Sequence, residues 1–239
     1  LLKDFRQQVL TQAVTGKLTE QWREGKELQS GKEFLIKIIN ERNSSLKKTV
    51  EFKEIKQVFQ IPSIWSFTYL QWVGEFTRGK SKHRPRNDKK LFDGPYPFIQ
   101  TGDVSKANMY INQYSTTYSE FGLQQSRLFP KGTLCITIAA NIAETAILNF
   151  AACFPDSVVA YIPYKNLYTS EFAMYYLNTI QKEIEQFAPA TAQKNINMGI
   201  LNEIPFPVPP LEEQQEIVRR VESLFAKADA IEASYEMLK

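Results

Sequence analysis

The longest regular pattern of apolar positions lies at the C-terminus, directly after a proline-rich segment. From Leu211 to Lys239 there is no proline or glycine, and apolar or small residues recur in alternating steps of four and three. These residues are Ile217, Val221, Leu224, Ala228, Ile231, Tyr235 and Leu238. The spacing predicts one coiled-coil-type helix, roughly 42 Å long at the usual rise per residue, with an apolar seam along it. Because such a stripe is not stable in water, either the chain's own N-terminal helix or a second copy packed antiparallel should cover it.

Two shorter helical patterns lie near the N-terminus. Residues 1–22 place four apolar side chains on one helical face, and this helix should end near Gly16. The four are Leu2, Phe5, Val9 and Ala13. A second helix should begin at Ser30, which forms a capping box with Glu33. The side chains expected on its buried side are Phe34, Leu35, Ile38 and Ile39. Residues 43–60 are polar with weak periodicity, and they are typical of a linker.

Between residues 62 and 205 the pattern changes to short β-rich runs separated by turn signals. Strands are expected at 72–76, 96–100, 109–112, 133–139, 146–150 and 157–162. A helix should follow at 171–186, burying Phe172, Tyr175, Tyr176, Leu177, Ile180 and Ile184. The predicted fold class is therefore α+β, with a globular domain of short strands and long coiled-coil-type helices. Its three segments are an N-terminal helical segment and linker at 1–60, the globular domain at 61–208 and the long helix at 209–239.

The composition is that of an intracellular globular protein. Hydrophobic residues make up 43% of the 239 residues, which is ample for a packed core. Cys135 and Cys153 lie in apolar surroundings without metal-ligand spacing, so we expect reduced, buried thiols. No apolar run approaches the ~18 residues of a membrane span and no signal peptide is visible, which favours a cytoplasmic protein without membrane contact. Because the first residue already lies in a helical pattern, we expect a fragment of a longer protein.

The residues needed for common catalytic sites are missing. The single histidine, His83, excludes a two-histidine metal site, and its lysine- and arginine-rich surroundings disfavour a Ser-His-Asp triad. There is no glycine-rich fingerprint for a nucleotide cofactor. Pro155-Asp156 has no downstream Asp/Glu-x-Lys triplet of the kind that nucleases use. We therefore expect no enzyme, no metal and no cofactor in this chain.

Positive charge is concentrated in one segment, although the formal net charge of the whole chain is only +3. Residues 78–87 carry five certain cations, and Lys89 and Lys90 follow. The physical use of such a cluster is phosphate binding. The residues predicted to contact DNA here are Lys80, Lys82, His83, Arg84 and Arg86. The lysines suit phosphates, whereas the two arginines could reach bases. The alternative interpretation is a solvated surface loop.

Two further polar segments could join this interface. The first, 100–108, follows an expected strand and contributes Thr101, Asp103, Lys106 and Asn108. The second, 188–197, contains small residues and contributes Gln193, Lys194 and Asn195 as hydrogen-bond donors. An ordinary capped turn and a plain linker, respectively, explain them equally well.

Several stretches together resemble a known family, the DNA-specificity subunit of type I restriction–modification enzymes. Residues 61–65 and Gly79-Lys80 are similar to the opening of its recognition domain, and 97–103 to its next landmark. Residues 132–147 resemble the central strand pair. The most specific similarity runs from the Thr191-Ala192-Gln193 region into Pro209–Val218. Coverage is essentially the whole chain. At Ala143, however, the family favours glycine.

The resemblance implies a protein that reads double-stranded DNA and performs no chemistry. Such subunits have two target recognition domains tied by two long helices, whereas this chain has one domain flanked by helical pieces. One half of a bipartite target would then be read here. The implied partners are methyltransferase subunits, which bind S-adenosylmethionine, and a restriction/translocase subunit, with a homodimer through the long helices also possible. The rival hypothesis is a coiled-coil protein-interaction scaffold with a solubilising basic loop.

Overall fold

The computed structural model describes residues 1–44, 55–139, 141–164, 169–186 and 196–237. The chain forms two compact units that are discontinuous in sequence. Unit 1 comprises 1–73, 164–179 and 204–239, and unit 2 comprises 74–163 and 180–203. None of the described helices combines the length and apolar character needed to cross a membrane.

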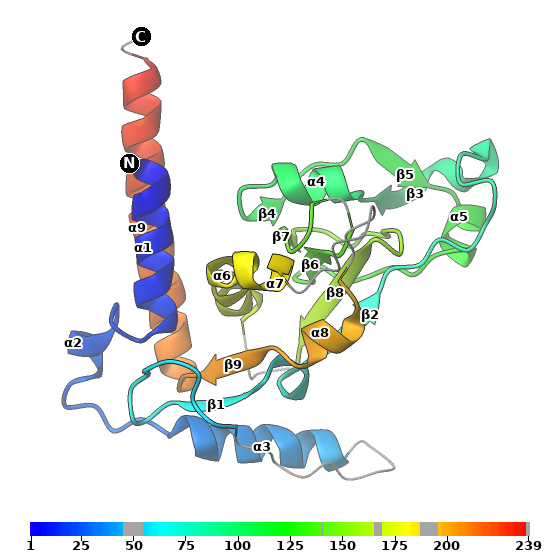
Figure 1. Ribbon diagram of the computed structural model, residues 1–239. Helices are drawn as coiled ribbons and strands as arrows, with labels where there is room; N and C mark the ends of the chain where they lie inside the picture. The colour runs from blue at the N-terminus through cyan, green and yellow to red at the C-terminus, as the bar shows by residue number, and fades with distance from the viewer. Residues whose placement is uncertain (45–54, 140, 165–168, 187–195, 238–239) are drawn as a thin grey trace. The chain divides into compact units, whose positions relative to one another are not determined.

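Unit 1 is built from helices around one two-stranded sheet (Figure 1). Its elements are α1 (Leu2–Val14), α2 (Glu20–Arg23), α3 (Gly31–Ser44), β1 (Ser66–Tyr69), the 3-10 helix η1 (Leu70–Trp72), α6 (Ser170–Thr179), β9 (Pro205–Val208) and α9 (Leu211–Glu236). The predicted capping box of α3 is confirmed. The Ser30 backbone N–H donates to Glu33 Oε2 at 3.0 Å, and the Glu33 N–H donates to Ser30 Oγ at 3.2 Å.

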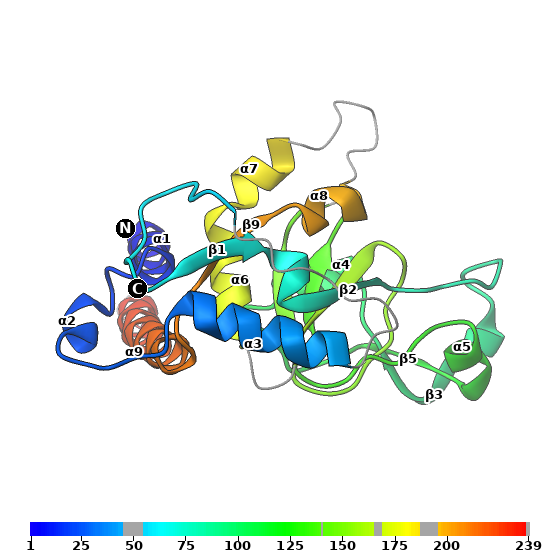
Figure 2. The same ribbon diagram turned by 90° about the horizontal axis from the view of Figure 1, so that it is seen from below.

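Helices α1 and α9 lie side by side in both ribbon views (Figures 1 and 2). They run antiparallel, because Arg6 pairs with Asp229 and Glu232 while Thr19, beyond the end of α1, reaches Glu213 at the start of α9. The C-terminal helix predicted from Leu211 is confirmed, and its described part ends at Glu236.

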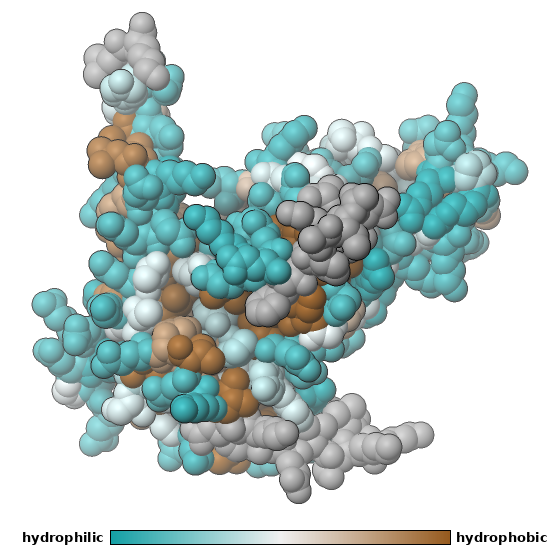
Figure 3. Space-filling model, viewed as in Figure 1, coloured by the Kyte–Doolittle hydropathy of each residue, from teal (hydrophilic) through white to brown (hydrophobic). Residues whose placement is uncertain are grey.

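The predicted seam of α9 is covered only along its first half. Ile217, Val221 and Ala228 are buried and Leu224 is half-buried. By contrast, Ile231 is 60% exposed and Tyr235 is 61% exposed. Figure 3 shows apolar, brown side chains among the hydrophilic ones along the column of α1 and α9. The chain's own helix therefore covers the first half, and the second half stays open in this chain. Leu238 lies outside the described residues.

The proline-rich segment before α9 forms a strand that the sequence pattern did not predict. Strand β9 pairs antiparallel with β1, with Val208 opposite Ser66 and Pro205 opposite Tyr69. A two-stranded sheet has only edge strands, and an edge strand tolerates prolines whose missing N–H would face away from its neighbour.

Unit 2 is built on a five-stranded sheet in the order β2-β8-β6-β7-β4. Neighbouring strands are antiparallel except for β4 and β7, which are parallel. The strands are β2 (Gly74–Arg78), β4 (Tyr110–Ile111), β6 (Leu134–Thr137), β7 (Thr145–Leu148) and β8 (Val158–Pro163). A separate antiparallel pair is formed by β3 (Phe92–Phe98) and β5 (Thr116–Tyr118). The helices of unit 2 are the 3-10 helix η2 (Lys89–Leu91), α4 (Thr101–Lys106), α5 (Glu120–Gln124), α7 (Gln181–Gln186) and α8 (Met198–Asn202).

The central strands of unit 2 are buried on both faces. Every residue of β6 and β7 is buried, and the rings of Phe129 and Phe154 stack at 4.1 Å beside them. Cys135 is a free, buried thiol in this core, and Cys153 is one in the neighbouring cluster with Leu91, Phe98 and Tyr118, as predicted. Burial raises the pKa of both thiols.

Two predictions about local structure need correction. The helix predicted at 171–186 is two helices, because α6 ends at Thr179 and α7 begins at Gln181. Ile180, predicted to be buried, is half-buried at the break. The polar segment 100–108 is not a simple turn, because its residues Thr101–Lys106 form the helix α4. The sequence pattern also gave no sign of the short strands β1 and β5.

Candidate nucleic-acid interface

The basic segment, residues 78–90, runs from the end of β2 into η2 and is held against the rest of unit 2 by backbone hydrogen bonds. The N–H of Gly79 donates to the Val158 carbonyl at 2.9 Å, and that of Lys80 to the Phe154 carbonyl at 3.1 Å. Further along, the N–H of Lys82 donates to the Gln125 carbonyl at 3.1 Å. Glycine is required at position 79, since a Cβ there would lie 2.2 Å from a backbone oxygen of Pro155. The first part of the segment is therefore a fixed platform.

The charge of this basic segment differs from that of the rest of the chain. It holds seven of the 29 lysines and arginines and one of the 26 acidic residues, so its net charge is +6. Since the whole chain carries +3, the remaining residues sum to −3. Figure 3 shows a mainly hydrophilic surface over this end of the unit, around η2 and α5. A polyanion would therefore be attracted to this segment rather than to the protein as a whole.

The arginines of the basic segment are engaged within the protein. Arg86 Nη2 lies 3.0 Å from Asp156 Oδ1, and Arg78 Nε donates to the backbone oxygen of Asp156 at 2.5 Å. Arg84 Nη1 donates to the carbonyl oxygens of Ser81 and His83, both at 2.8 Å. These bonds orient the guanidinium groups and reduce the number of N–H groups left for a base.

His83 and the lysines differ in their surroundings. His83 Nε2 lies 2.8 Å from Asp88 Oδ2. The Lys90 backbone N–H, and then His83, lower the pKa of Asp88. Within the described part of the chain, neither Lys80 nor Lys82 forms an ion pair with a carboxylate. Lys82 is exposed and Lys80 is half-buried. These two ammonium groups are thus available to phosphates.

The second predicted segment separates into a capping part and an exposed part. Asp103 Oδ2 accepts a hydrogen bond from the Gln100 backbone N–H at 2.8 Å, which caps α4. Thr101 is half-buried and its carbonyl accepts from Ser105 Oγ at 3.1 Å. Lys106 and Asn108 are exposed. Asp103 therefore has a structural role, whereas Lys106 and Asn108 can meet a ligand. Gln193, Lys194 and Asn195 lie outside the described residues.

Lys106 and Asn108 border a hollow of about 510 Å³ in the surface of unit 2. The hollow is lined by Asp103 and by the continuous stretch from Lys106 to Gln113. Asn112 at its far end accepts a hydrogen bond from Asn149 Nδ2 at 2.8 Å. Sequence reasoning missed these two amides, because they lie near the ends of two separate expected strands and are 37 residues apart in the sequence.

In unit 1 the conspicuous polar cluster is buried rather than exposed. Glu213, in the first turn of α9, is completely buried. Its carboxylate accepts hydrogen bonds from Thr19 Oγ1 at 2.7 Å and from Trp65 Nε1 at 2.8 Å, and it pairs with Arg23 Nη1. The cluster ties three separate stretches of the chain together.

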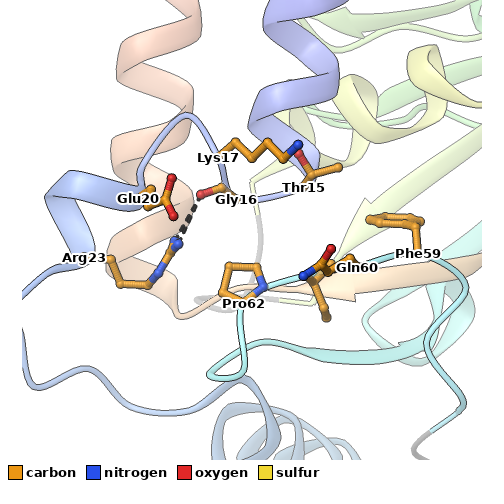
Figure 4. Close-up of a pocket in the computed structure, with 9 residues that line it drawn as sticks. Thr15, Gly16, Lys17, Glu20, Arg23, Phe59, Gln60 and Pro62 are labelled. Carbon is orange, nitrogen blue, oxygen red and sulfur yellow. Dashed lines mark hydrogen bonds between the residues drawn. The ribbon is translucent and has the colours of Figure 1, made fainter.

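Arg23 of this buried cluster also borders a hollow of about 350 Å³ in unit 1 (Figure 4). Arg23 also donates to the Gly16 carbonyl, and Pro62 is another of the lining residues. Gly16 has φ of +75°, and a Cβ there would lie 2.5 Å from Pro62. Glycine is therefore required where α1 turns toward α2.

The basic segment, the hollow of unit 2 and the start of α9 all lie within the part of the chain that matches a protein family. A model of the family described as type I restriction modification DNA specificity domain matches residues 47–238. The chain belongs to this family. In the buried cluster, Trp65 lies in the stretch 61–65 and Glu213 lies in Pro209–Val218, two of the stretches on which the resemblance rests. The start of α9 therefore has a packing role in this chain.

Individual relatives agree with the family. The chain is 29% identical over 237 residues to the type I restriction enzyme EcoBI specificity subunit of Escherichia coli, covering 97% of this chain and 45% of the relative. It is 30% identical over 239 residues to the EcoDI specificity subunit of the same species, covering 97% and 48%. The chain thus spans about half the length of these relatives.

Solved structures share the fold. The HsdS subunit of Thermoanaerobacter tengcongensis gives a TM-score of 0.59 at 19% identity, covering 85% of this chain and 46% of that one. The S subunit of a type I restriction–modification system from M. genitalium gives 0.51 at 15% identity, covering 98% and 54%. The predicted α+β class with a long C-terminal helix is confirmed by this likeness.

Proposed function

We propose that this chain recognises double-stranded DNA in a sequence-specific manner, as one half of a type I specificity subunit that reads one half of a bipartite target. The observation that carries the proposal is the basic segment 78–90, which concentrates six net positive charges on a backbone fixed to a folded unit. Phosphates supply most of the affinity in such interfaces, and a fixed platform sets the register on the duplex.

The wider role that we propose is that of a scaffold without its own chemistry. The chain would carry methyltransferase subunits, on which S-adenosylmethionine binds, and would assemble with a restriction/translocase subunit. The isolated chain would bind no S-adenosylmethionine and catalyse no reaction. Family membership supports this assignment, since the relatives are specificity subunits.

The salt dependence of DNA binding tests the proposal. Lys80 and Lys82 should each neutralise about one phosphate, so replacing both by alanine should weaken binding to every duplex and reduce the slope of log K against log salt by about two units. Binding would be measured by fluorescence anisotropy with a randomised duplex at several salt concentrations. The matched control is Lys3→Ala with Lys37→Ala, which removes the same charge from two exposed lysines of unit 1.

Two results would contradict the proposal. An unchanged salt slope in the Lys80→Ala, Lys82→Ala variant would remove the basic segment from the interface. Negligible affinity of the unmutated chain at any salt concentration would favour the rival function, a coiled-coil scaffold with a solubilising loop. The exposed Ile231 and Tyr235 on α9 are the observation that makes this rival worth testing.

A further inference from the structure

The polar groups around the hollow of unit 2 are mainly uncharged amides. Asn108, Asn112 and Gln113 line it and are exposed, and Asn149 joins them through its bond to Asn112. We refer to these four residues as the amide cluster. Lys106 stands on the rim as an exposed cation. The carboxylate in the wall, Asp103, is already bonded to the Gln100 backbone.

Hydrogen bonds determine which way the two central amides face. Asn112 Nδ2 donates to the Tyr110 carbonyl at 3.3 Å, and a carbonyl can only accept. The Oδ1 of Asn112 must therefore be the atom that accepts from Asn149, at 2.8 Å. As a result, Asn149 keeps its carbonyl oxygen and one N–H, which lie in the same amide plane.

The backbone beneath this pair is rigid. Asn112 directly follows β4 and Asn149 directly follows β7, and the two strands are hydrogen-bonded in parallel. The Asn149 backbone N–H donates to the Ile111 carbonyl at 3.2 Å. A side chain whose plane is fixed by a neighbour and whose backbone belongs to a sheet is well preorganised for recognition.

An acceptor beside a donor in one amide plane matches the major-groove edge of adenine. Adenine offers N6–H as a donor and N7 as an acceptor, and asparagine pairs with both atoms at once. Aromatic side chains flank the amides. Tyr114 is 49% exposed and packs edge-on against Phe150 at 5.2 Å, which provides an apolar contact for a thymine methyl group.

We propose that the amide cluster reads an A·T base pair, with Asn149 as the specificity-determining residue and Asn112 as its positioning residue. The inference rests on the proposed function and deepens it, because it divides the work of recognition. The basic segment supplies phosphate contacts, while its arginines are held by Asp156 and by backbone carbonyls. The amide cluster supplies the base contact.

Selection of duplexes tests this division. The full chain and its variants would each be used to enrich a randomised duplex pool, which is then sequenced. Asn149→Ala should lose the preference for A·T at one position, where discrimination should fall by about tenfold or more, with the salt slope unchanged. Asn149→Asp offers acceptors only, so it should shift the preference at that same position toward C·G. Asn141→Ala is the matched control, because it removes a comparable 2.9 Å bond between two side chains, to Ser105, and Asn141 does not belong to the amide cluster.

The outcomes separate the inference from the function on which it depends. If the unmutated chain enriches a sequence and the folded Asn149 variants enrich the same sequence with the same selectivity, the amide pair is only a structural clip and the inference is wrong. If the unmutated chain enriches no sequence, both the inference and the proposed function are wrong. Thermal melting of each variant, followed by circular dichroism, identifies any that fail to fold. In the Asn149→Asp variant the carboxylate faces Asn112 Oδ1 and this bond is lost. Because position 149 is exposed, the variant keeps the test available should Asn149→Ala unfold.

Discussion

The buried carboxylate of Glu213 offers the sharpest test of how unit 1 is held together. In Glu213→Gln one accepting oxygen is replaced by an N–H₂ group. The three groups around it, from Thr19, Arg23 and Trp65, are all donors, so at least one of them would face another donor. The variant also leaves the guanidinium of Arg23, 17% exposed, without its anionic partner.

The expected cost follows from these two losses. A hydrogen bond to a charged group contributes about 1.5–3 kcal/mol, and removing one partner of a buried ion pair costs about 3–5 kcal/mol. These values overlap because they describe the same contacts, and water reaches Arg23 in part. We therefore expect a loss of about 3 kcal/mol in the free energy of unfolding.

Urea unfolding at pH 7 would measure this loss. Circular dichroism should report it, since the fluorescence of Trp65 itself is affected by the substitution. Glu212→Gln is the matched control, because Glu212 is an exposed neighbour in the same first helical turn and its replacement should cost less than about 1 kcal/mol. If Glu213→Gln is no less stable than Glu212→Gln, the carboxylate does not tie the three segments together.

Three further predictions follow from single residues. Ala143 has φ of +59°, so Ala143→Gly should raise the free energy of unfolding in urea by about 1 kcal/mol. The control Ala146→Gly, in strand β7, should lower it, and a loss of stability in both variants would contradict backbone strain at Ala143. Arg219, and then Arg220, lower the pKa of Glu216 to about 2. The ionised Glu216 carboxylate thus stabilises the fold above its unfolded pKa of about 4.5, and this contribution is lost as pH falls toward 2. Glu216→Gln should therefore flatten the pH dependence of stability in that range, and an unchanged profile would refute this prediction. Finally, Ile231→Lys should abolish self-association in light scattering and leave the fold intact, since Ile231 is exposed within the chain, and Leu224→Lys should act in the same direction. An antiparallel pair would hold two recognition domains about one turn of B-DNA apart, so a stable monomer that binds one half-site as tightly as two would contradict this arrangement.

Local sequence signals were sufficient where the physical cause is also local. The Ser30–Glu33 capping box, the helix from Leu211 and the buried strands around Leu134–Thr137 all follow from hydrogen bonding or side-chain periodicity within one turn or one strand. The position of Ala143 belongs here too. We expected glycine there, and the φ of +59° at Ala143 is a conformation that glycine adopts more readily than other residues.

The boundaries of some elements, and the strand β9, depended on contacts with other parts of the chain. Strand β9 contains prolines that disfavour a strand by propensity, and it forms because β1 supplies a single partner on the side where hydrogen bonds are available. The break between α6 and α7 occurs at Ile180, although the apolar period continues through it. Periodicity alone cannot detect such a break, since it records which face is apolar and not whether one helix continues.

Composition and short-range order were therefore enough to predict the family, the α+β class, the long helix and the charge of the basic segment. Which polar groups act together depended on tertiary packing. It buried Glu213 among donors from Thr19, Arg23 and Trp65, it engaged Arg86 with Asp156, and it joined Asn112 to Asn149. Hydrogen bonds of 2.7–3.0 Å between distant residues exist only after strands and helices have packed, so no spacing along the chain could have predicted them.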